Sequence, residues 1–299
     1  MKVDLRHIAL IGFGEAGGIF GADLAKAGRD VVVYDILLER ADTRMRVQQR
    51  AADAGVRCAA STLEAVRGAD LVISAVTASA SAEVARAAAP ALAAGQAFLD
   101  INSVSPATKR VNAELIEARG ATYVDAAVMA PVPPQRLAVP ILLGGSQAAE
   151  LAGALNALGM NTVAIAREVG VASAVKMCRS IVIKGLEALA LESLLAARHF
   201  GAEEQVLASL QRSFPDMGWG AALPDYLISR IAEHGRRRVE EMREVARTLE
   251  DVKLEPLMAR ATAARQEWLV ESMQARGLNY QSEPAFSWRS LIDRLAEKK

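Results

Sequence analysis

Short apolar runs alternate with helical stretches along the first half of the chain. The pattern predicts a buried strand at residues 7–11, a helix at 15–27 that ends at Gly28, and a second strand at 31–35. A strand, a helix and a second strand within about 30 residues have the size of a parallel crossover. The chain is therefore expected to open with one βαβ unit.

The same alternation continues to about residue 165. Further strands are predicted at residues 71–75, 97–101, 122–126, 139–143 and 161–165, and helices at 81–89, 106–119 and 147–158. Strands that alternate with helices in this way predict an α/β fold with a doubly wound, mainly parallel sheet.

The pattern changes after residue 168. Apolar positions then recur at helical spacing over residues 171–199, 228–249 and 257–274, with no strand-like run. Gly201, Pro256 and the stretch 215–220 interrupt these helices, and the tail 277–299 is too mixed to assign. We expect one domain over residues 1–168 and an all-α domain over 169–299 that begins with a long interdomain helix.

The composition is that of a soluble globular protein. Hydrophobic residues make up 52% and charged residues 23% of the 299 positions, which is enough for two domains with substantial cores. Lysine plus arginine equals aspartate plus glutamate, 35 against 35, so no excess positive charge draws the chain to polyanions. We expect neither nucleic acid nor a membrane among its partners.

Metal and disulfide chemistry are both disfavoured. Cys58 and Cys178 are the only cysteines and lack metal-ligand spacing, and the three histidines form no His-x-x-x-His pair. Asp4, Arg6 and His7 stand where a signal peptide would be apolar, and no later stretch offers about 18 uninterrupted apolar residues. We expect a cytoplasmic protein without a bound metal.

The strongest local motif is a complete G-x-G-x-x-G between the first strand and the first helix. It runs Gly12-Phe13-Gly14-Glu15-Ala16-Gly17. The first glycine permits the tight turn, the second lets the backbone approach a pyrophosphate, and the third allows helix and strand to pack closely. The motif predicts a Rossmann-type domain whose dinucleotide site includes all six residues.

Asp35 bears on the identity of the dinucleotide. It ends the second strand, 23 residues after Gly12, where an acidic side chain accepts hydrogen bonds from the adenosine ribose. Its negative charge would repel a 2′-phosphate and so favours NAD. Arg40 and Arg44 follow on the next helix and leave NADP possible. The alternative is an ordinary strand-end aspartate at a structural turn.

The loop after the strand at 71–75 is expected to border the cofactor, because ligands of parallel sheets bind at the carboxyl ends of the strands. Val76 and Thr77 are placed to make that contact through their backbone. An ordinary helix cap explains the Thr77 side chain equally well.

The loop after the strand at 97–101 carries several polar side chains. Asn102 and Ser103 offer amide and hydroxyl groups that could hold a substrate carboxylate beside a nicotinamide. Ser105 is explained as the N-cap of a helix that starts at Pro106, but capping does not explain its two polar neighbours.

Lys176 lies near the start of the long helix among small and apolar residues. Arg179 and Ser180 follow three and four positions later on its face. Burial would favour the neutral form of Lys176 and bring its pKa toward working pH, which suits a proton-transfer group. From the residues alone, a lysine that reaches solvent from a helix N-terminus is the simpler interpretation.

With these motifs in order, the chain resembles the β-hydroxyacid dehydrogenase superfamily, which includes 3-hydroxyisobutyrate and 6-phosphogluconate dehydrogenases. The resemblance covers residues 6–190, more loosely the helical domain, and rests on the stretches 12–17, 100–106 and 170–180. It implies a homodimeric NAD(P)-dependent oxidoreductase that transfers hydride between nicotinamide and the hydroxyl or carbonyl carbon of a β-hydroxy acid-like substrate. It also implies that Lys176 is the general acid/base and that Ser103 lies near substrate and nicotinamide, beside Asn102.

The chain departs from the pattern of this family at three places. Ser180, preceded by Arg179, stands where the family commonly has an asparagine one turn after the lysine. The stretch 125–131, which contains Met129, replaces a Ser-Gly-Gly carboxylate cradle with an apolar segment, so we expect a bulkier or less polar substrate. Ile183 stands where decarboxylating members carry a glutamate, so no assisted decarboxylation is expected. These stretches resemble a little-characterised bacterial branch of NAD-binding, phosphogluconate dehydrogenase-like proteins.

Two other functions stay open. The same scaffold could reduce imines, although Lys176 suits alcohol chemistry better, or it could bind a dinucleotide without catalysis. His234 and the arginines 236–238 could meet an anionic substrate, although a solvated helix face explains them too.

Overall fold

A computed structural model describes residues 4–280 and 285–297. The chain divides into two units, Met1–Met177 and Cys178–Lys299, and each contains its own hydrophobic core. The division falls within a long helix, α8 (Val171–His199). The domain boundary at residue 168, just before this helix, stays a prediction.

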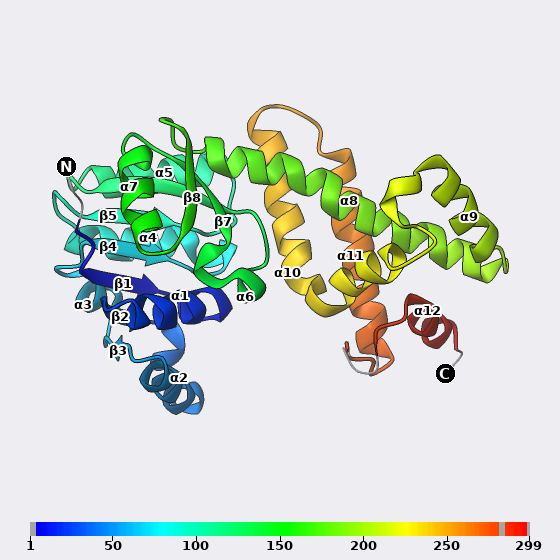
Figure 1. Ribbon diagram of the computed structural model, residues 1–299, viewed down its shortest axis with the longest axis horizontal. Coiled ribbons are helices and arrows are strands. Elements are labelled where there is room, and N and C mark those ends of the chain that lie inside the picture. The colour runs from blue at the N-terminus through cyan, green and yellow to red at the C-terminus, as the bar shows by residue number, and fades with distance from the viewer. Residues whose placement is uncertain (1–3, 281–284, 298–299) are drawn as a thin grey trace. The chain divides into compact units, whose positions relative to one another are not determined.

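Among the described residues of the first unit, eight strands form one sheet (Figure 1). They are β1 His7–Ile11, β2 Asp30–Tyr34, β3 Arg57–Cys58, β4 Leu71–Ser74, β5 Ala97–Asp100, β6 Thr122–Val128, β7 Pro140–Gly144 and β8 Asn161–Ala166. Their order across the sheet is β3-β2-β1-β4-β5-β6-β7-β8. Neighbours are parallel except β6 and β7, which run antiparallel. The predicted α/β fold with a mainly parallel sheet is confirmed.

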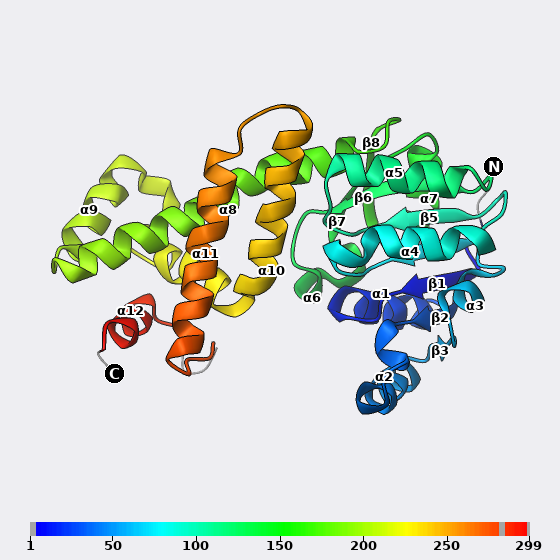
Figure 2. The same cartoon turned by 180° about the vertical axis from the view of Figure 1, so that it is seen from behind.

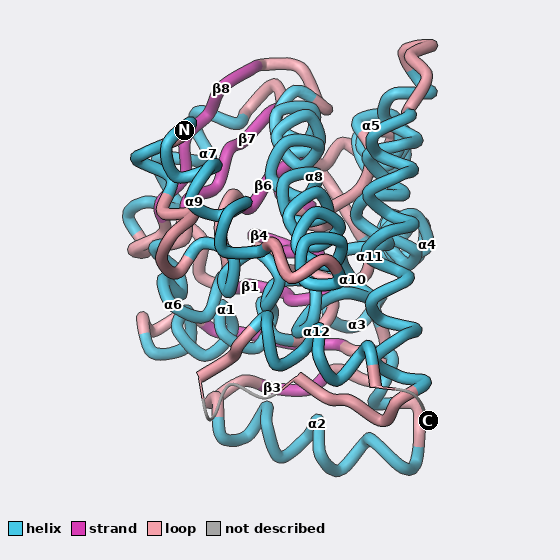
Figure 3. The backbone as a smooth tube through the Cα atoms, turned by 90° about the vertical axis from the view of Figure 1, so that its right-hand side faces the viewer, coloured by secondary structure: helices cyan, strands magenta, loops and turns pink. Residues whose placement is uncertain are grey.

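Helices cover both faces of this sheet. Figure 3 shows the sheet nearly edge-on, with α1 (Glu15–Lys26) and α7 (Ala148–Ala157) on one side. The other side carries α3 (Thr62–Val66), α4 (Ser81–Ala88) and α5 (Pro106–Glu117), of which α4 and α5 lie side by side in Figure 2. Because helices cover both faces of the sheet, the central strands are buried on both sides and consist mainly of consecutive apolar residues. Two further helices, α2 (Ala41–Asp53) and α6 (Val132–Gln135), complete the first unit.

The sheet order places a ligand-binding edge at the carboxyl ends of β1 and β4. The chain proceeds from β1 outward to β2 and β3, then returns to the other side of β1 for β4 and β5. Such a reversal leaves a crevice between the loops that follow the two strands flanking it. In this protein those loops are the glycine-rich loop and the loop that begins at Ala75.

The described part of the second unit is helical, as predicted. Besides most of α8 it contains α9 (Glu203–Ser213), α10 (Leu223–Asp251), α11 (Leu257–Ala275) and α12 (Trp288–Ala296). All five helices contribute to its core, which buries Trp219 and Trp288, whereas Trp268 is partly exposed. The sequence left α9 and α12 unassigned. Within residues 4–280 and 285–297, no helix is both long and apolar enough to span a membrane.

Candidate active site

The glycines of the loop at 12–17 are required by the close approach of neighbouring backbone. Gly12 has a φ of +95°, and a Cβ at this position would lie 2.4 Å from the carbonyl oxygen of Ala75. A Cβ at Gly17 would lie 2.1 Å from the Gly12 oxygen, whereas a Cβ at Gly14 would meet nothing within 4 Å. Gly14 is the N-cap of α1, so open space adjoins a helix N-terminus, where a pyrophosphate is favourably bound. The loop therefore fits a dinucleotide.

Asp35 ties the end of β2 to this loop. One carboxylate oxygen accepts a hydrogen bond from the Phe13 backbone N–H at 2.7 Å, and the other accepts from Leu37 N–H at 2.9 Å. Each oxygen keeps a second acceptor position, so the side chain can still receive ribose hydroxyls. Asp35 is thus more than a strand-end residue, because it orients the glycine-rich loop as well.

Other side chains around the loop are placed as follows. Phe13 is buried beneath the guanidinium of Arg50, whose carbon lies 5.3 Å from the ring centroid, while Glu15 is exposed and Ala16 half-buried. The Arg44 Nε donates to the Leu38 carbonyl at 2.7 Å. Arg40 is exposed and lies 3.4 Å from Asp42.

Asn102 is buried and holds the two neighbouring loops together. Its Oδ1 accepts the N–H of Val76 at 2.7 Å, and its Nδ2 donates to the Ser74 hydroxyl at 2.8 Å. The Val76 N–H is therefore engaged within the protein, and contact between Val76 and a cofactor stays a prediction. Thr77 is exposed, and its hydroxyl lies 3.1 Å from that of Ser79, without the helix-capping bond that was the alternative.

Ser103 and Lys176 meet although they are far apart in the chain. The Lys176 Nζ donates to the Ser103 Oγ at 2.7 Å, and the lysine is half-buried. Both residues belong to the first unit. The N-cap predicted for the helix after this loop is present, since the Ser105 Oγ accepts the Thr108 N–H at 3.2 Å.

The remaining predicted substrate residues lie on different elements. Met129 follows β6, is half-buried, and donates its N–H to the Pro140 carbonyl at 2.9 Å. Arg179 is exposed and Ser180 buried, and both fall in the second unit. Their contact with a substrate stays a prediction.

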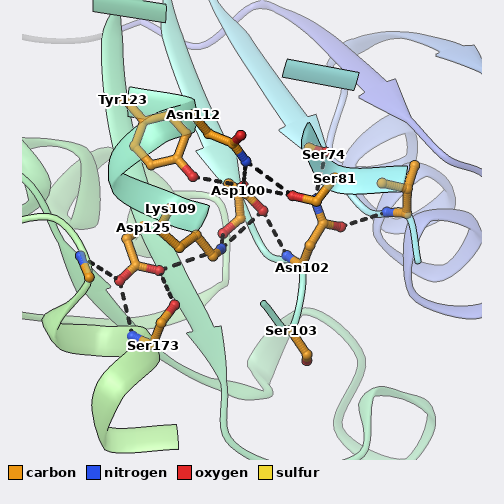
Figure 4. A network of polar contacts seen from close by, with 12 residues as sticks. Ser74, Ser81, Asp100, Asn102, Ser103, Lys109, Asn112, Tyr123, Asp125 and Ser173 are labelled. Carbon is orange, nitrogen blue, oxygen red and sulfur yellow. Dashed lines mark hydrogen bonds and ion pairs between the residues drawn. The ribbon is translucent and has the colours of Figure 1, made fainter. Parts of the chain in front are cut away.

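Sequence reasoning missed a set of buried charges next to the loop that carries Ser103 (Figure 4). We call Asp100, Lys109 and Asp125 the buried triad; none exposes more than 1% of its surface. The Lys109 Nζ lies 3.0 Å from Asp100 Oδ1 and 3.4 Å from Asp125 Oδ1. The spacing of residues on α5 could have indicated that Lys109 is buried. Lys109 and Asn112 lie on the same face of this helix as the buried Ile116.

One of the three arginines predicted on a solvated face of α10 is buried, whereas Arg236 is exposed. Arg238 is only 8% exposed, and its Nη1 lies 2.9 Å from Glu187 Oε2. Arg237 is exposed and pairs with Glu241 at 3.0 Å. His234 sits at a kink in α10, with φ −123° and ψ 16°, and burial lowers its pKa. The solvated-face interpretation is therefore wrong for Arg238.

Comparison with known proteins places this geometry in a family. Residues 7–166 match the family described as the NAD binding domain of 6-phosphogluconate dehydrogenase, which is more than half of the chain. The protein belongs to this β-hydroxyacid dehydrogenase-like family. Residues 197–269 match a domain of unknown function, DUF1932. The resemblance drawn from the motifs is confirmed, and the first unit of this dehydrogenase-like protein is an NAD(P)-binding domain.

Three relatives illustrate the relationship. A conserved hypothetical protein from Sinorhizobium meliloti 1021 is 37% identical, with 98% of this chain and 97% of that chain covered and a TM-score of 0.78. The 3-hydroxyisobutyrate dehydrogenase of Pseudomonas aeruginosa is 28% identical over 231 residues, 73% of either chain. The 3-hydroxyisobutyrate dehydrogenase of Mycobacterium tuberculosis shares the fold, with a TM-score of 0.73 at 18% identity over 97% of this chain and 99% of that one.

Proposed function

We propose that the protein is an NAD-dependent dehydrogenase that interconverts the hydroxyl and carbonyl forms of a β-hydroxy acid-like substrate. The observation that carries the proposal is the 2.7 Å contact between the Lys176 amino group and the Ser103 hydroxyl. It joins the first residues of α8 to the loop after β5, at the edge of the sheet that also holds the glycine-rich loop. The homodimeric state implied by the resemblance stays a prediction.

Lys176 acts as the general acid/base in this proposal. When the hydroxyl is oxidised, the neutral amine accepts the proton from the substrate oxygen, and in the reverse direction the ammonium returns it. A bound nicotinamide supplies the partner for hydride transfer. Ser103 holds the amine in one orientation and can donate its own hydrogen to the same substrate oxygen.

The position at which decarboxylating relatives carry a second acid is apolar in this chain. Ile183 occupies the position seven residues after Lys176. The nearest following glutamate, Glu187, is buried and paired with Arg238 at 2.9 Å. We therefore propose oxidation without assisted decarboxylation, on a substrate less polar than hydroxyisobutyrate because Met129 and its apolar neighbours replace a polar cradle.

Lys176→Ala tests the proposal. Turnover of a panel of 3-hydroxy acids with small to bulky substituents should fall by about a hundred-fold or more, because general acid/base catalysis contributes about that much. NADH affinity, measured by fluorescence titration, should stay within about twofold because the dinucleotide loop is untouched. The matched control is Lys26→Ala, which removes an exposed lysine at the end of α1 and should change neither quantity.

Retained turnover in Lys176→Ala would remove the lysine from the mechanism. Two outcomes with the unaltered protein would contradict the proposed dehydrogenase activity. These are reduction of cyclic imines with no hydroxy acid turned over, and NADH binding with no turnover of either class.

Asp35→Ala tests the preference for NAD. Loss of the carboxylate removes an acceptor for the ribose hydroxyls and a charge that repels a 2′-phosphate. We expect NAD to bind about tenfold more weakly, which corresponds to about 1.4 kcal/mol of binding free energy. We also expect kcat/KM with NAD to exceed kcat/KM with NADP by a smaller factor than in the unaltered protein. An unchanged ratio would show that Asp35 serves only to hold the N–H groups of Phe13 and Leu37.

A further inference from the structure

The buried triad is hydrogen-bonded to the two segments that carry Ser103 and Lys176. Lys109 lies within 3.4 Å of both aspartates, and its Nζ also donates to the Asp100 carbonyl at 2.5 Å. One buried cation therefore joins the end of β5 to β6. We propose that the triad is a positioning device that fixes the Lys176 amino group against the Ser103 hydroxyl. The inference rests on the proposed function, in which Lys176 exchanges the proton.

The loop that carries Ser103 is anchored to Asp100. The Asp100 Oδ1 accepts the backbone N–H of Asn102 at 2.9 Å, directly before Ser103. The Asn102 side chain then continues to Val76 N–H, so the same aspartate also steadies the loop after β4 (Figure 4). Movement of Asp100 would therefore displace Ser103 and the neighbouring loop together.

The helix that carries Lys176 is anchored to Asp125. The Asp125 Oδ2 accepts the N–H groups of Gly170 at 3.1 Å and Ser173 at 3.0 Å, and its Oδ1 accepts the Ser173 hydroxyl at 2.6 Å. These N–H groups belong to the first turn of a helix, which has no partners for them within the helix itself. Ser173 stands three residues before Lys176, so Asp125 fixes the turn from which the lysine side chain departs.

The arrangement matters because the lysine side chain is flexible. Holding one rotamer of a long side chain costs more free energy than one ordinary hydrogen bond contributes. The Ser103 contact can hold the amine only if the two backbones already lie at the right separation. Lys109, bonded to both aspartates, sets that separation, and Lys109 and Asp125 are therefore positioning residues.

Two substitutions in the same network separate positioning from mere stability. Ser173→Ala deletes a hydroxyl that donates to Asp125 at 2.6 Å, and Tyr123→Phe deletes one that donates to Asp100 Oδ2 at 2.7 Å. Both hydroxyls are buried and both acceptors are triad carboxylates. Only the first bond joins the triad directly to the helix of Lys176, because Tyr123 lies on β6 and donates to Asp100 Oδ2, whereas the Asn102 N–H is bonded to Oδ1.

We expect Ser173→Ala to lower kcat by about tenfold while KM for the dinucleotide stays unchanged, because the amine is misplaced and the cofactor loop is not. Ser173→Thr keeps the hydroxyl and should restore kcat. Tyr123→Phe should leave kcat within about twofold, although it lowers Tm by a few degrees for the lost buried bond. Amide hydrogen exchange is measured in the protein without ligands. In Ser173→Ala it should become faster at residues 101–105 and at residues 170–177. In Tyr123→Phe it should be unchanged in both segments.

Equal effects of the two variants on kcat would overturn the inference, as would faster exchange confined to residues 170–177. These outcomes are distinct from failure of the proposed function. If Lys176→Ala retains turnover, the proposed acid/base is wrong. If that variant is inactive and the two hydroxyl deletions behave alike, only the positioning role is wrong.

Discussion

Two buried charge networks contact α8, one in each unit, and they join different kinds of structure. The triad of Asp100, Lys109 and Asp125 has one cation and two anions, and its bonds lead to loop backbones and to the first turn of α8. Its members come from β5, α5 and β6, at the edge of the sheet where ligands of such folds bind.

The second network joins helix to helix. Lys184 and Glu187 of α8 pair with Glu241 and Arg238 of α10, at 2.6 and 2.9 Å. The Arg238 Nε also donates to the Arg230 carbonyl at 3.1 Å, a bond that spans the kink in α10. Two cations and two anions balance, and no loop backbone takes part in these bonds among the described residues.

The difference shows what a buried charge can control. Charges bonded to loop backbones set the positions of the side chains that those loops carry, whereas charges shared by two helices set the register and the bend of the helices. Burial raises the pKa of Glu187 to about 7 despite Arg238 and lowers the pKa of Lys184. The second network thus makes stability depend on pH, while the first bears on the chemistry.

The largest effect is expected from breaking the triad. Lys109→Met replaces the cation with an apolar chain of similar length and leaves two buried carboxylates without their common partner. We expect the free energy of unfolding to fall by about 3–5 kcal/mol, measured by urea unfolding. Adding Asp125→Asn removes the like-charge pair and should recover part of the loss. A loss below about 1 kcal/mol would mean that the triad is not coupled as the distances indicate.

A smaller, pH-dependent effect is expected from the second network. Because the folded-state pKa of Glu187 is raised from 4.5 to about 7, its contribution to stability is complete below about pH 4.5 and is lost as the pH rises through 7. Relative to Glu187→Gln, the unaltered protein should therefore lose up to about 3 kcal/mol of stability between pH 5 and 8. Urea unfolding of both proteins across this range measures the difference. Parallel stability curves would show that Glu187 keeps an ordinary pKa.

Much of the fold could be predicted because its strands are covered on both faces. The apolar run at His7–Ile11 was predicted at its observed bounds, since burial on both faces demands continuous hydrophobicity. The reversed direction of β7 and β8 could not be predicted. A run of apolar residues looks the same in a parallel and in an antiparallel strand. The strand Arg57–Cys58 was missed because two exposed residues carry no pattern.

The candidate site could be proposed from the sequence where its motifs are local. The glycine-rich loop follows from its spacing, and Lys176 and Ser103 each follow from a short stretch that resembles the family. The triad was not predicted, because lysine and aspartate are ordinarily surface residues and their burial depends on partners far away in the chain. Asn102 was assigned to substrate, and that contact stays a prediction; the sequence did not reveal that its amide also bonds to Val76 and Ser74.

The most direct test compares two buried carboxylates at different distances from the proposed acid/base. Asp125 bonds to Ser173, about one helical turn before Lys176, whereas Glu187 stands eleven residues after it, about 16 Å along the helix. Oxidation requires neutral Lys176, and a nearby negative charge favours the protonated form.

The measurement is the pH dependence of kcat/KM for hydroxyl oxidation in Asp125→Asn and Glu187→Gln. We predict that Asp125→Asn moves the limb of rising activity to lower pH by about one unit, because the substitution removes a buried carboxylate bonded to Ser173, one helical turn before Lys176. Glu187→Gln should leave that limb in place, because screening weakens the interaction over that distance. Equal shifts in both variants, or an unmoved limb in Asp125→Asn, would contradict the claim that the triad governs Lys176.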